Sequence, residues 1–259
     1  MAIYTENTDV YGYLFREGSK APEFTTYSTM LQSDPSAALV PFRMHSWRFE
    51  SAIGALRSGI AGGIMVQPAL ATEAFGYAEA YTDLAMRTKL VDTLLVDRDT
   101  RQVTGDCAGV VAIRALHGNA ISEMKQGNSI PEIKEPRVLI MGDQEFTRMA
   151  LVAIAGQVDY AMILSDNDWG RQIAEDPMIT FGITVDVCTS EELPDRIHET
   201  NYPIQQNRLR TPPGLNAAYL LASTVGLFRG IPDALVGKTA EAYMDILNLE
   251  EAHKKVKDI

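Results

Sequence analysis

Two aspartates, Asp92 and Asp106, and one lysine, Lys238, are residues of this chain whose types could do chemistry. Asp92 precedes the apolar run 93–97, and Asp106 follows a second extended segment. Carboxylic acids and amines act as general acids and bases when their surroundings bring their pKa values toward neutrality. A lysine can also form a Schiff base with a ketone. These residue types therefore indicate proton transfer or imine chemistry on a small molecule.

Each of these residues also has a structural interpretation. Asp92 suits a solvated loop position before a strand as well as it suits a pocket. Asp106 is equally suited to be the N-cap of a helix that starts near Val110. Lys238 is typical of a solvated helix surface, and the neighbouring Cys107 is typical of a small buried side chain.

The elements that would position these residues follow from hydrophobic periodicity and from turn residues. In the first half of the chain the expected strands are residues 37–40, 61–66, 93–97 and 102–104. The expected helices are residues 49–59, residues 71–86 and a helix that includes 110–116. Pro41 is expected to end the first strand, because proline cannot donate a hydrogen bond to a sheet.

The second half of the chain begins after a polar segment with two prolines, residues 128–136, which we interpret as a linker. Strands are expected at residues 137–141, 160–165 and 179–187, and they alternate with helices at 145–156 and 169–176. Short apolar strands that alternate with helices predict a parallel sheet. Residues 201–214 are polar and rich in turn formers, and helices at 215–228 and 234–249 follow. The pattern predicts two α/β lobes with a ligand-binding cleft between them.

A family resemblance rests on four short motifs in the first half. They are Ser19-Lys20-Ala21-Pro22, Met65-Val66-Gln67-Pro68-Ala69-Leu70, Leu90-Val91-Asp92-Thr93 and Asp106-Cys107-Ala108-Gly109. Their spacing resembles that of shikimate dehydrogenases, which reduce a ring ketone with NADPH. The resemblance covers about residues 10–190 and 215–250, and it is a match of spacing more than of identity.

The resemblance implies an α/β fold with two domains. Residues 1–116 and 214–259 would form the substrate-binding domain, and residues 117–213 would form a reduced, Rossmann-like domain. The C-terminal helices would thus return to the first lobe. Within the first domain the resemblance implies that Ser19 holds a substrate carboxylate. It further places the following residues at the substrate: Val66, Asp92, Thr93, Asp106, Cys107, Lys238 and Tyr243.

Two residues that would carry the family's reaction are absent from this sequence. The motif position of the catalytic lysine holds Leu70, and the position of its aspartate partner holds Ala108. Neither side chain can carry a proton. At two neighbouring positions, Asp92 and Asp106 replace amide side chains of the family motifs. These four differences from the family motifs predict a pocket whose chemistry differs from that of the family.

The turn that would bind a dinucleotide is also altered. The family's glycine-rich segment corresponds here to Gly142, Asp143, Gln144 and Glu145, and only the first glycine remains. Glycines at this turn let the backbone approach a diphosphate, and the added acids would repel it. We therefore expect no tightly bound cofactor. We expect Asp166 to be the N-cap of the next helix.

Three functions are compatible with these observations. The first is cofactor-independent acid–base catalysis, such as elimination, hydration or isomerisation, on a small cyclic hydroxy- or oxo-acid. The second is an NAD(P)-dependent oxidoreductase of the shikimate and quinate dehydrogenase type with an altered catalytic pair. The third is a protein that binds such a ligand without catalysis. The two added carboxylates would also suit an amino-carboxylate ligand.

Composition excludes several other classes. The net charge is −11, which disfavours binding to nucleic acids. No apolar stretch approaches the roughly 20 residues that span a bilayer, and no signal peptide is visible, so a cytoplasmic protein is expected. The four histidines are scattered, which argues against a metal site. A homodimer is compatible with the sequence.

Overall fold

The computed structural model describes residues 9–16, 22–31, 34, 36–44, 49–97, 99–126, 135–206 and 215–257. It divides into two compact units. The first unit consists of Met1–Ala112 and Pro212–Ile259, and the second is Ile113–Thr211. The expected α/β fold, with C-terminal helices that return to the first unit, is confirmed. The domain boundaries expected from the sequence stay a prediction.

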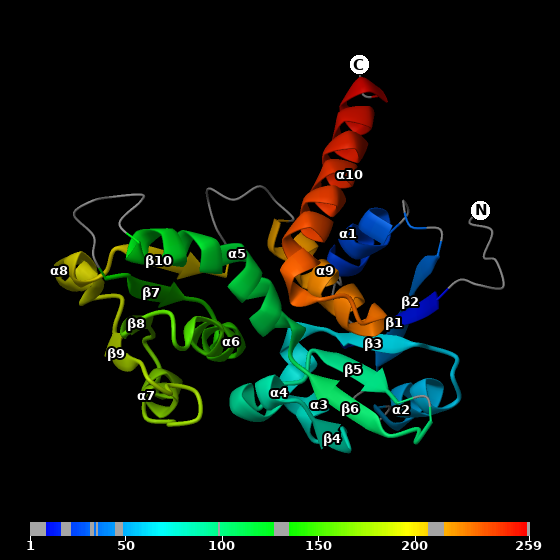
Figure 1. The fold of residues 1–259 in the computed structure, drawn as a ribbon, viewed down its shortest axis with the longest axis horizontal. Coiled ribbons are helices and arrows are strands. Elements are labelled where there is room, and N and C mark those ends of the chain that lie inside the picture. The colour runs from blue at the N-terminus through cyan, green and yellow to red at the C-terminus, as the bar shows by residue number, and fades with distance from the viewer. Residues whose placement is uncertain are drawn as a thin grey trace. The chain divides into compact units, whose positions relative to one another are not determined.

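The described strands of the first unit form a six-stranded mixed sheet of order β2-β1-β3-β5-β6-β4 (Figure 1). Its strands are β1 (Asp9–Arg16), β2 (Ala37–Met44), β3 (Gly63–Val66), β4 (Ala80–Tyr81), β5 (Thr93–Val96) and β6 (Val103–Asp106). β1 pairs in parallel with β2 and β3, whereas β5 is antiparallel to both β3 and β6. Because β1 and β3 are parallel, their carboxyl ends lie at one edge of the sheet.

The helical segments of the first unit come from both ends of its sequence. They are α1 (Pro22–Leu31), α2 (Phe49–Arg57), η1 (Pro68–Leu70), α3 (Ala71–Phe75), α4 (Asp83–Thr88), α9 (Leu215–Arg229), η3 (Asp233–Leu235) and α10 (Val236–Lys257). Helices α9 and α10 pack against each other and against α1 (Figure 1). Helix α5 (Ala108–Lys125) begins in the first unit and continues into the second.

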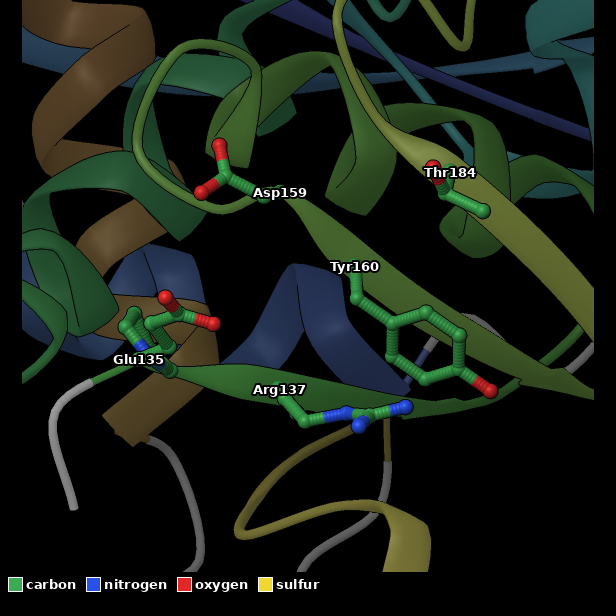
Figure 2. Close-up of a pocket in the computed structure, with 6 residues that line it drawn as sticks. Glu135, Arg137, Asp159, Tyr160 and Thr184 are labelled. Atoms are coloured by element: carbon green, nitrogen blue, oxygen red, sulfur yellow. The ribbon is translucent and has the colours of Figure 1, made fainter.

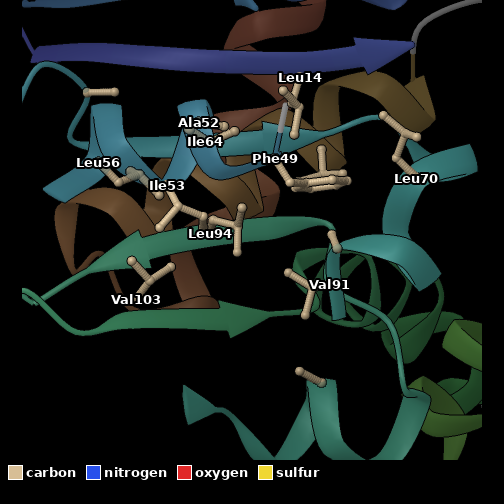
Figure 3. Packing of buried hydrophobic residues seen from close by; sticks show 14 residues of the cluster. Leu14, Phe49, Ala52, Ile53, Leu56, Ile64, Leu70, Val91, Leu94 and Val103 are labelled. Carbon is tan, nitrogen blue, oxygen red and sulfur yellow. The ribbon is translucent and has the colours of Figure 1, made fainter. Parts of the chain in front are cut away.

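One hydrophobic core supports the site in the first unit. Helix α2 places its apolar face, including Phe49, Ile53 and Leu56, against the sheet, as its helical spacing predicts (Figure 3). Leu70 is 1% exposed and belongs to the same cluster, together with Val91 from the segment before β5. The core thus includes three residues of the sequence motifs, Val66, Leu70 and Val91.

The described strands of the second unit form a parallel sheet of order β10-β7-β8-β9. They are β7 (Arg137–Met141), β8 (Tyr160–Leu164), β9 (Thr184–Cys188) and β10 (Tyr202–Gln205). The helical segments between them are α6 (Gln144–Ile154), α7 (Asp168–Ala174), α8 (Leu193–Arg196) and η2 (Ile197–Glu199). The strand order reverses at β7, because β8 and β9 lie on one side of it and β10 on the other. This is the arrangement of a doubly wound, Rossmann-like sheet.

Several elements differ from the sequence-based predictions. The single helix expected at 71–86 is two short helices with β4 between them, because Gly76 and Thr82 end one helix and start the next. β2 continues through Pro41 to Met44, which an edge strand tolerates. The strand expected at 179–187 begins only at Thr184. β10 lies in the segment that was expected to be turns.

Candidate functional site

Five of the residues expected at the substrate lie at one end of the strands of the six-stranded sheet, where β1 and β3 have their carboxyl ends. The register pairs Met65 of β3 with Thr93 of β5, and Thr93 with Asp106 of β6. The backbone N–H of Val66 donates to the carbonyl oxygen of Asp92 at 2.7 Å. We call this the candidate edge, and it consists of Val66, Asp92, Thr93, Asp106 and Cys107.

Asp92 is bound to the start of helix α5. One carboxylate oxygen, Oδ1, accepts the backbone N–H of Ala108 at 2.7 Å and the hydroxyl of Thr93 at 2.9 Å. The other oxygen, Oδ2, accepts the backbone N–H of Gly109 at 2.7 Å. The first N–H groups of a helix have no partner within it, so a carboxylate there both satisfies them and interacts with the helix dipole. Asp92 is therefore the cap of α5.

The surroundings of Asp92 change its acidity and that of its neighbour Cys107. Burial raises the pKa of Asp92 to about 6, although the N–H groups of Gly109 and Ala108 act in the opposite direction. The Cys107 sulfur lies 3.8 Å from Asp92 Oδ2. Burial, and then the nearby Asp92 charge, raise the pKa of the Cys107 thiol well above its usual value. Cys107 is thus a neutral, buried thiol and a poor nucleophile.

Asp106 is held by a different set of donors. Its Oδ1 accepts the backbone N–H of Cys107 at 2.6 Å and the hydroxyl of Thr82 at 2.7 Å. Burial raises the pKa of Asp106 above its ordinary value. Thr82 is also the N-cap of α4, where it accepts the N–H of Ala85. Thr82 was not among the residues identified from the sequence, although a threonine followed by Asp-Leu-Ala is a recognisable helix start.

Core residues occupy the two positions at which the resemblance implies a catalytic lysine and its aspartate partner. Leu70 is 1% exposed and packs in the cluster that includes Ile64 and Val91. Ala108 is fully buried in the first turn of α5. At both positions the side chain contributes to packing, and neither offers a group that can exchange a proton with a ligand.

The other residues expected at the substrate do not join the candidate edge. Lys238 is exposed on α10, and it forms no hydrogen bond or ion pair with any described residue. Tyr243 is buried near Asp34, Arg229 and Tyr11, and burial raises its pKa to about 12. Ser19 lies outside the described residues.

Tyr243 belongs to a separate cluster around Arg229. The Arg229 guanidinium donates to Asp34 at 2.6 Å, to the Tyr11 hydroxyl at 3.2 Å and to the Ser36 hydroxyl at 3.0 Å. Asp34 and Ser36 precede β2, and Tyr11 lies in the first half of β1. This cluster therefore lies toward the amino ends of β1 and β2, away from the candidate edge.

Arg16, at the end of β1, is an exposed cation near the candidate edge. The side chain of Arg16 is 58% exposed, and its guanidinium lies 3.6 Å from the carboxylate of Glu73. The backbone N–H of Arg16 donates to Gln67 Oε1 at 3.2 Å, which links the ends of β1 and β3. An exposed guanidinium can bind a carboxylate through paired hydrogen bonds. Arg16 was not among the residues identified from the sequence.

In the second unit, the point where strand order reverses lies between β7 and β10. Ligands of doubly wound sheets bind in the crevice at the carboxyl ends of such strands. Gly142 and Asp143 follow β7, and Gln206 follows β10. The backbone N–H of Gln206 donates to the carbonyl of Met141 at 3.0 Å, so the pairing of the two strands continues up to this crevice.

The chain's own side chains fill this crevice. Asp143 is the N-cap of α6, and its Oδ1 accepts the N–H of Phe146 at 2.8 Å. The Gln206 amide donates to Asp143 Oδ2 at 2.6 Å and accepts the Asp143 N–H at 2.9 Å. A Cβ added at Gly142 would lie 2.4 Å from the Phe146 ring, so the ring covers the glycine.

A dinucleotide does not fit these residues. Its diphosphate needs free N–H groups at the helix start and open space above a glycine. Here Asp143 supplies a carboxylate to the helix start, and Phe146 occupies the space. Asp166, at the end of β8, is not the helix cap that the sequence predicted. It accepts the backbone N–H of Ser190 at 2.7 Å and its hydroxyl at 2.6 Å, and Asn167 is the N-cap residue of α7.

A pocket of about 190 Å³ lies at the opposite edge of this sheet (Figure 2). Arg137, Tyr160 and Thr184, the first residues of β7, β8 and β9, line it. The Arg137 guanidinium stacks 4.1 Å from the centre of the Tyr160 ring. The Tyr160 hydroxyl lies 3.0 Å from a carboxylate oxygen of Asp186, so its polar group is already bound. Amino ends of parallel strands are not where doubly wound folds bind cofactors.

The described part of the chain contains neither a cluster of metal ligands nor a membrane-spanning helix. No three histidine, cysteine, aspartate or glutamate side chains gather there as metal ligands would. Among the same residues, no helix is long and apolar enough to cross a membrane.

Comparison with known proteins supports the fold alone. No protein-family model matches the sequence, and no curated protein sequence is significantly similar to it. Quinate dehydrogenase from Corynebacterium glutamicum, solved in complex with NAD, aligns with a TM-score of 0.67 at 14% identity. The alignment covers 92% of this chain and 99% of that one.

Two further solved structures give the same result. Shikimate dehydrogenase from Mycobacterium tuberculosis aligns with a TM-score of 0.65 at 14% identity, over 93% of this chain and 99% of that one. Shikimate dehydrogenase from Aquifex aeolicus gives 0.64 at 12% identity, over 92% and 99%. These likenesses span both units and the returning helices. The chain therefore has the fold of the shikimate and quinate dehydrogenases.

Proposed function

We propose that this protein binds a small polar hydroxy- or oxo-carboxylic acid, or an amino-carboxylic acid, at the candidate edge without catalysing its oxidation or reduction. The observation that carries the proposal is the burial of Leu70 and Ala108. They stand where the family resemblance implies a lysine and an aspartate, and both belong to the hydrophobic interior. Proton transfer at these two positions would require titratable groups, which these side chains lack.

The fold and one charged side chain support a carboxylate-bearing ligand. The three solved structures compared above are named for shikimate and quinate, which are cyclic hydroxy-acids. Arg16 presents an exposed guanidinium at the end of β1, next to the sequence motif that includes Ser19. Asp92 and Asp106 are bound to backbone N–H groups, whereas the exposed guanidinium of Arg16, beside the candidate edge, is an ionic group that a ligand can reach.

Cofactor-independent acid–base catalysis, the first function expected from the sequence, has weaker support. Asp92 and Asp106 have the raised pKa values that such catalysis would use. Their oxygens, however, accept hydrogen bonds from the start of α5 and from Thr82. Lys238 is exposed on α10 and makes no bond to either of them. The three solved structures compared above are dehydrogenases by name, and another structure with this fold is a reductase by name.

A second candidate function is an NAD(P)-dependent oxidoreductase. It is favoured by the likeness to quinate dehydrogenase, whose structure was solved with NAD and is covered over 99% of its length. Against it stand the carboxylate of Asp143 and the ring of Phe146 at the dinucleotide turn. This function would require a dinucleotide to bind elsewhere or to displace these side chains.

The experiment that tests the proposal measures binding and turnover on the same samples. Shikimate, quinate and their keto forms are titrated by calorimetry, and each is then incubated with NAD⁺, NADP⁺, NADH or NADPH while absorbance at the nicotinamide band is followed. We expect saturable binding with a Kd between about 1 μM and 1 mM and no change in nicotinamide absorbance. We expect Arg16→Gln to weaken binding about tenfold, the loss of one charged hydrogen bond.

The control is Arg57→Gln. Arg57 is an exposed arginine at the end of α2, and it pairs with Glu79, which lies between α3 and β4, away from the candidate edge. This variant should leave ligand affinity unchanged. Reduction of NAD⁺ or NADP⁺ by either acid would replace the proposal with the second candidate. Conversion of an acid without cofactor would show the acid–base function instead. Absence of binding by every acid would contradict the proposal.

A further inference from the structure

We propose that Asp143, Phe146 and Gln206 form an internal plug that occupies the diphosphate position of the Rossmann-like sheet and keeps dinucleotides out of it. The inference concerns the second unit and does not rest on ligand binding at the candidate edge. Three independent features of the crevice between β7 and β10 carry it.

The first feature is the position of the plug. Asp143 follows β7 and Gln206 follows β10, the two strands between which the order of the sheet reverses. The crevice at the carboxyl ends of these strands is where doubly wound folds hold their cofactors. The plug thus lies at the cofactor position itself.

The second feature is the reciprocity of the bonds across the crevice. The Asp143 N–H donates to Gln206 Oε1 at 2.9 Å, and the Gln206 amide N–H donates back to Asp143 Oδ2 at 2.6 Å. The other carboxylate oxygen accepts the N–H of Phe146 at 2.8 Å. A phosphate oxygen at the helix start would compete for the same N–H groups. Here the chain provides the anion itself.

The third feature is the use of space and charge around Gly142. The Phe146 ring lies so close that a Cβ on Gly142 would be 2.4 Å from it, and the amide oxygen of Gln206 would be 3.1 Å away. The glycine that remains from the family turn therefore accommodates a side chain of this protein. Asp143 and Glu145 also place negative charge in the first turn of α6, and this repels a second anion.

The first test uses the full chain without substitutions. NADH and NADPH are titrated while nicotinamide fluorescence and the heat of binding are followed. We expect no saturable binding up to about 1 mM, a concentration that would detect ordinary cofactor affinity. Saturable binding at micromolar NADH or NADPH would overturn the proposal. This result does not depend on whether any variant folds.

The second test removes the plug's anion. In Asp143→Ala the start of α6 loses its cap, so we expect Tm to fall by several degrees, as for the loss of a helix cap. Inorganic pyrophosphate should then raise the Tm of Asp143→Ala more than that of the wild type, because the freed N–H groups accept an anion. Equal responses of the two proteins to pyrophosphate, or an unchanged Tm of the variant, would contradict the proposal.

The matched control is Asp168→Ala. Asp168 is an exposed aspartate in the first turn of α7, the next helix of the same unit, and no described residue bonds to its side chain. Removing it takes away the same charge near a helix start without removing a cap or a partner across the crevice. We expect its Tm and its response to pyrophosphate to stay close to those of the wild type.

Discussion

Asp92 differs by one atom from the amide that the resemblance implies at this position, and it caps helix α5. The resemblance places an amide at this position, and an amide has one accepting oxygen and one donating nitrogen. Asp92 uses both of its oxygens as acceptors, for Ala108 and Gly109 at the start of α5. An asparagine in the same pose would turn an N–H toward one of these N–H groups. The carboxylate is thus suited to capping α5.

Asp92 should make stability depend on pH. Because burial raises its pKa in the folded protein to about 6, from about 3.9 in an unfolded chain, the folded state holds the proton more tightly. The stabilisation is fully present below about pH 4 and is lost as pH rises through about 6. We expect Asp92→Asn to remove this part of the pH dependence, measured as the urea midpoint between pH 4 and pH 7.5. The variant should also lose one bond to α5 above about pH 6, where Asp92 is ionised and both of its oxygens accept, a loss of about 1 kcal/mol.

Asp97→Asn is the matched comparison at an exposed position. The backbone N–H of Thr100 holds the pKa of Asp97 below its ordinary value. Its stabilisation is therefore present above about pH 4 and lost on acidification, the opposite sign to Asp92. The urea midpoints of the wild type and Asp92→Asn should differ by an amount that changes across this pH range. A constant difference would show that burial does not control the acidity of Asp92.

The sequence could identify Asp92 and Asp106 as notable residues but could not give their roles. The N–H partners of Asp92 lie 16 and 17 positions away, and they become neighbours only when β5 and β6 pair. Gln206 is 63 positions from Asp143, in a segment without a hydrophobic pattern. Long-range hydrogen bonds of this kind leave no local signal, whereas helix caps such as Thr82 do.

At the level of elements, the returning helix α9 packs closely on the sheet. Phe228 of α9 stacks on Tyr11 of β1 with the ring centres 4.5 Å apart. Its ring also lies against Gly63 of β3, where an added Cβ would be 2.1 Å from a ring atom. The absence of a side chain at Gly63 therefore allows helix and strand to pack together.

Gly63→Ala should destabilise the first unit. The added methyl group overlaps the Phe228 ring, and overpacking of this kind costs about 1–3 kcal/mol. Chemical denaturation measures the change, and the double variant Gly63→Ala with Phe228→Leu should recover part of it. Gly54→Ala in α2 is the control, because no atom lies within 4 Å of the new Cβ. It should be neutral or stabilising by about 0.5–1 kcal/mol.

The Arg229 cluster is a second link between α9 and the sheet. Arg229→Met leaves Asp34, Tyr11 and Ser36 without their shared donor, and we expect it to cost about 2–3 kcal/mol of unfolding free energy. Arg57→Met breaks an ion pair whose side chains are 48% and 41% exposed, and it should cost less than about 1 kcal/mol. Equal losses of unfolding free energy in the two variants would show that the cluster around Arg229 stabilises the protein no more than an exposed ion pair does.

The accuracy of the element predictions follows the strength of the local pattern. β7 spans the predicted residues 137–141, because a short apolar run between polar segments defines a buried strand. The helix expected at 71–86 is interrupted, because its high alanine and glutamate content hid the turn at Gly76. β1 was not predicted, although its burial is nearly complete from Tyr11 to Phe15.

At the scale of the whole molecule, each unit has its own hydrophobic core. The cluster that includes Leu14, Leu70 and Leu94 belongs to the first unit, and the cluster of Leu139, Met162 and Cys188 belongs to the second. Elements with separate cores can open separately. The fold predicted from motif spacing is confirmed at this scale, because spacing reflects the order and lengths of elements even where identities are lost.

Hydrogen exchange should show these separate cores. We expect Gly63→Ala to speed the exchange of amides in β1, β3 and β5 of the first unit. Amides in β7 and β8 should keep their wild-type rates, as measured by mass spectrometry of peptides from each unit. Faster exchange in both units would mean that the chain opens as one cooperative body.

The outer strands of the six-stranded sheet have a consequence for how the protein behaves at high concentration. In the described part of the chain, β2 is one edge of this sheet and includes Pro41, which has no N–H to donate. The other edge is β4, which spans only two residues, Ala80 and Tyr81. Aggregation of folded chains through strand edges requires a long, regular row of free backbone donors and acceptors. Pro41 interrupts the donors of β2 and β4 has only two residues, so we expect this sheet to offer little to a second folded chain for strand pairing.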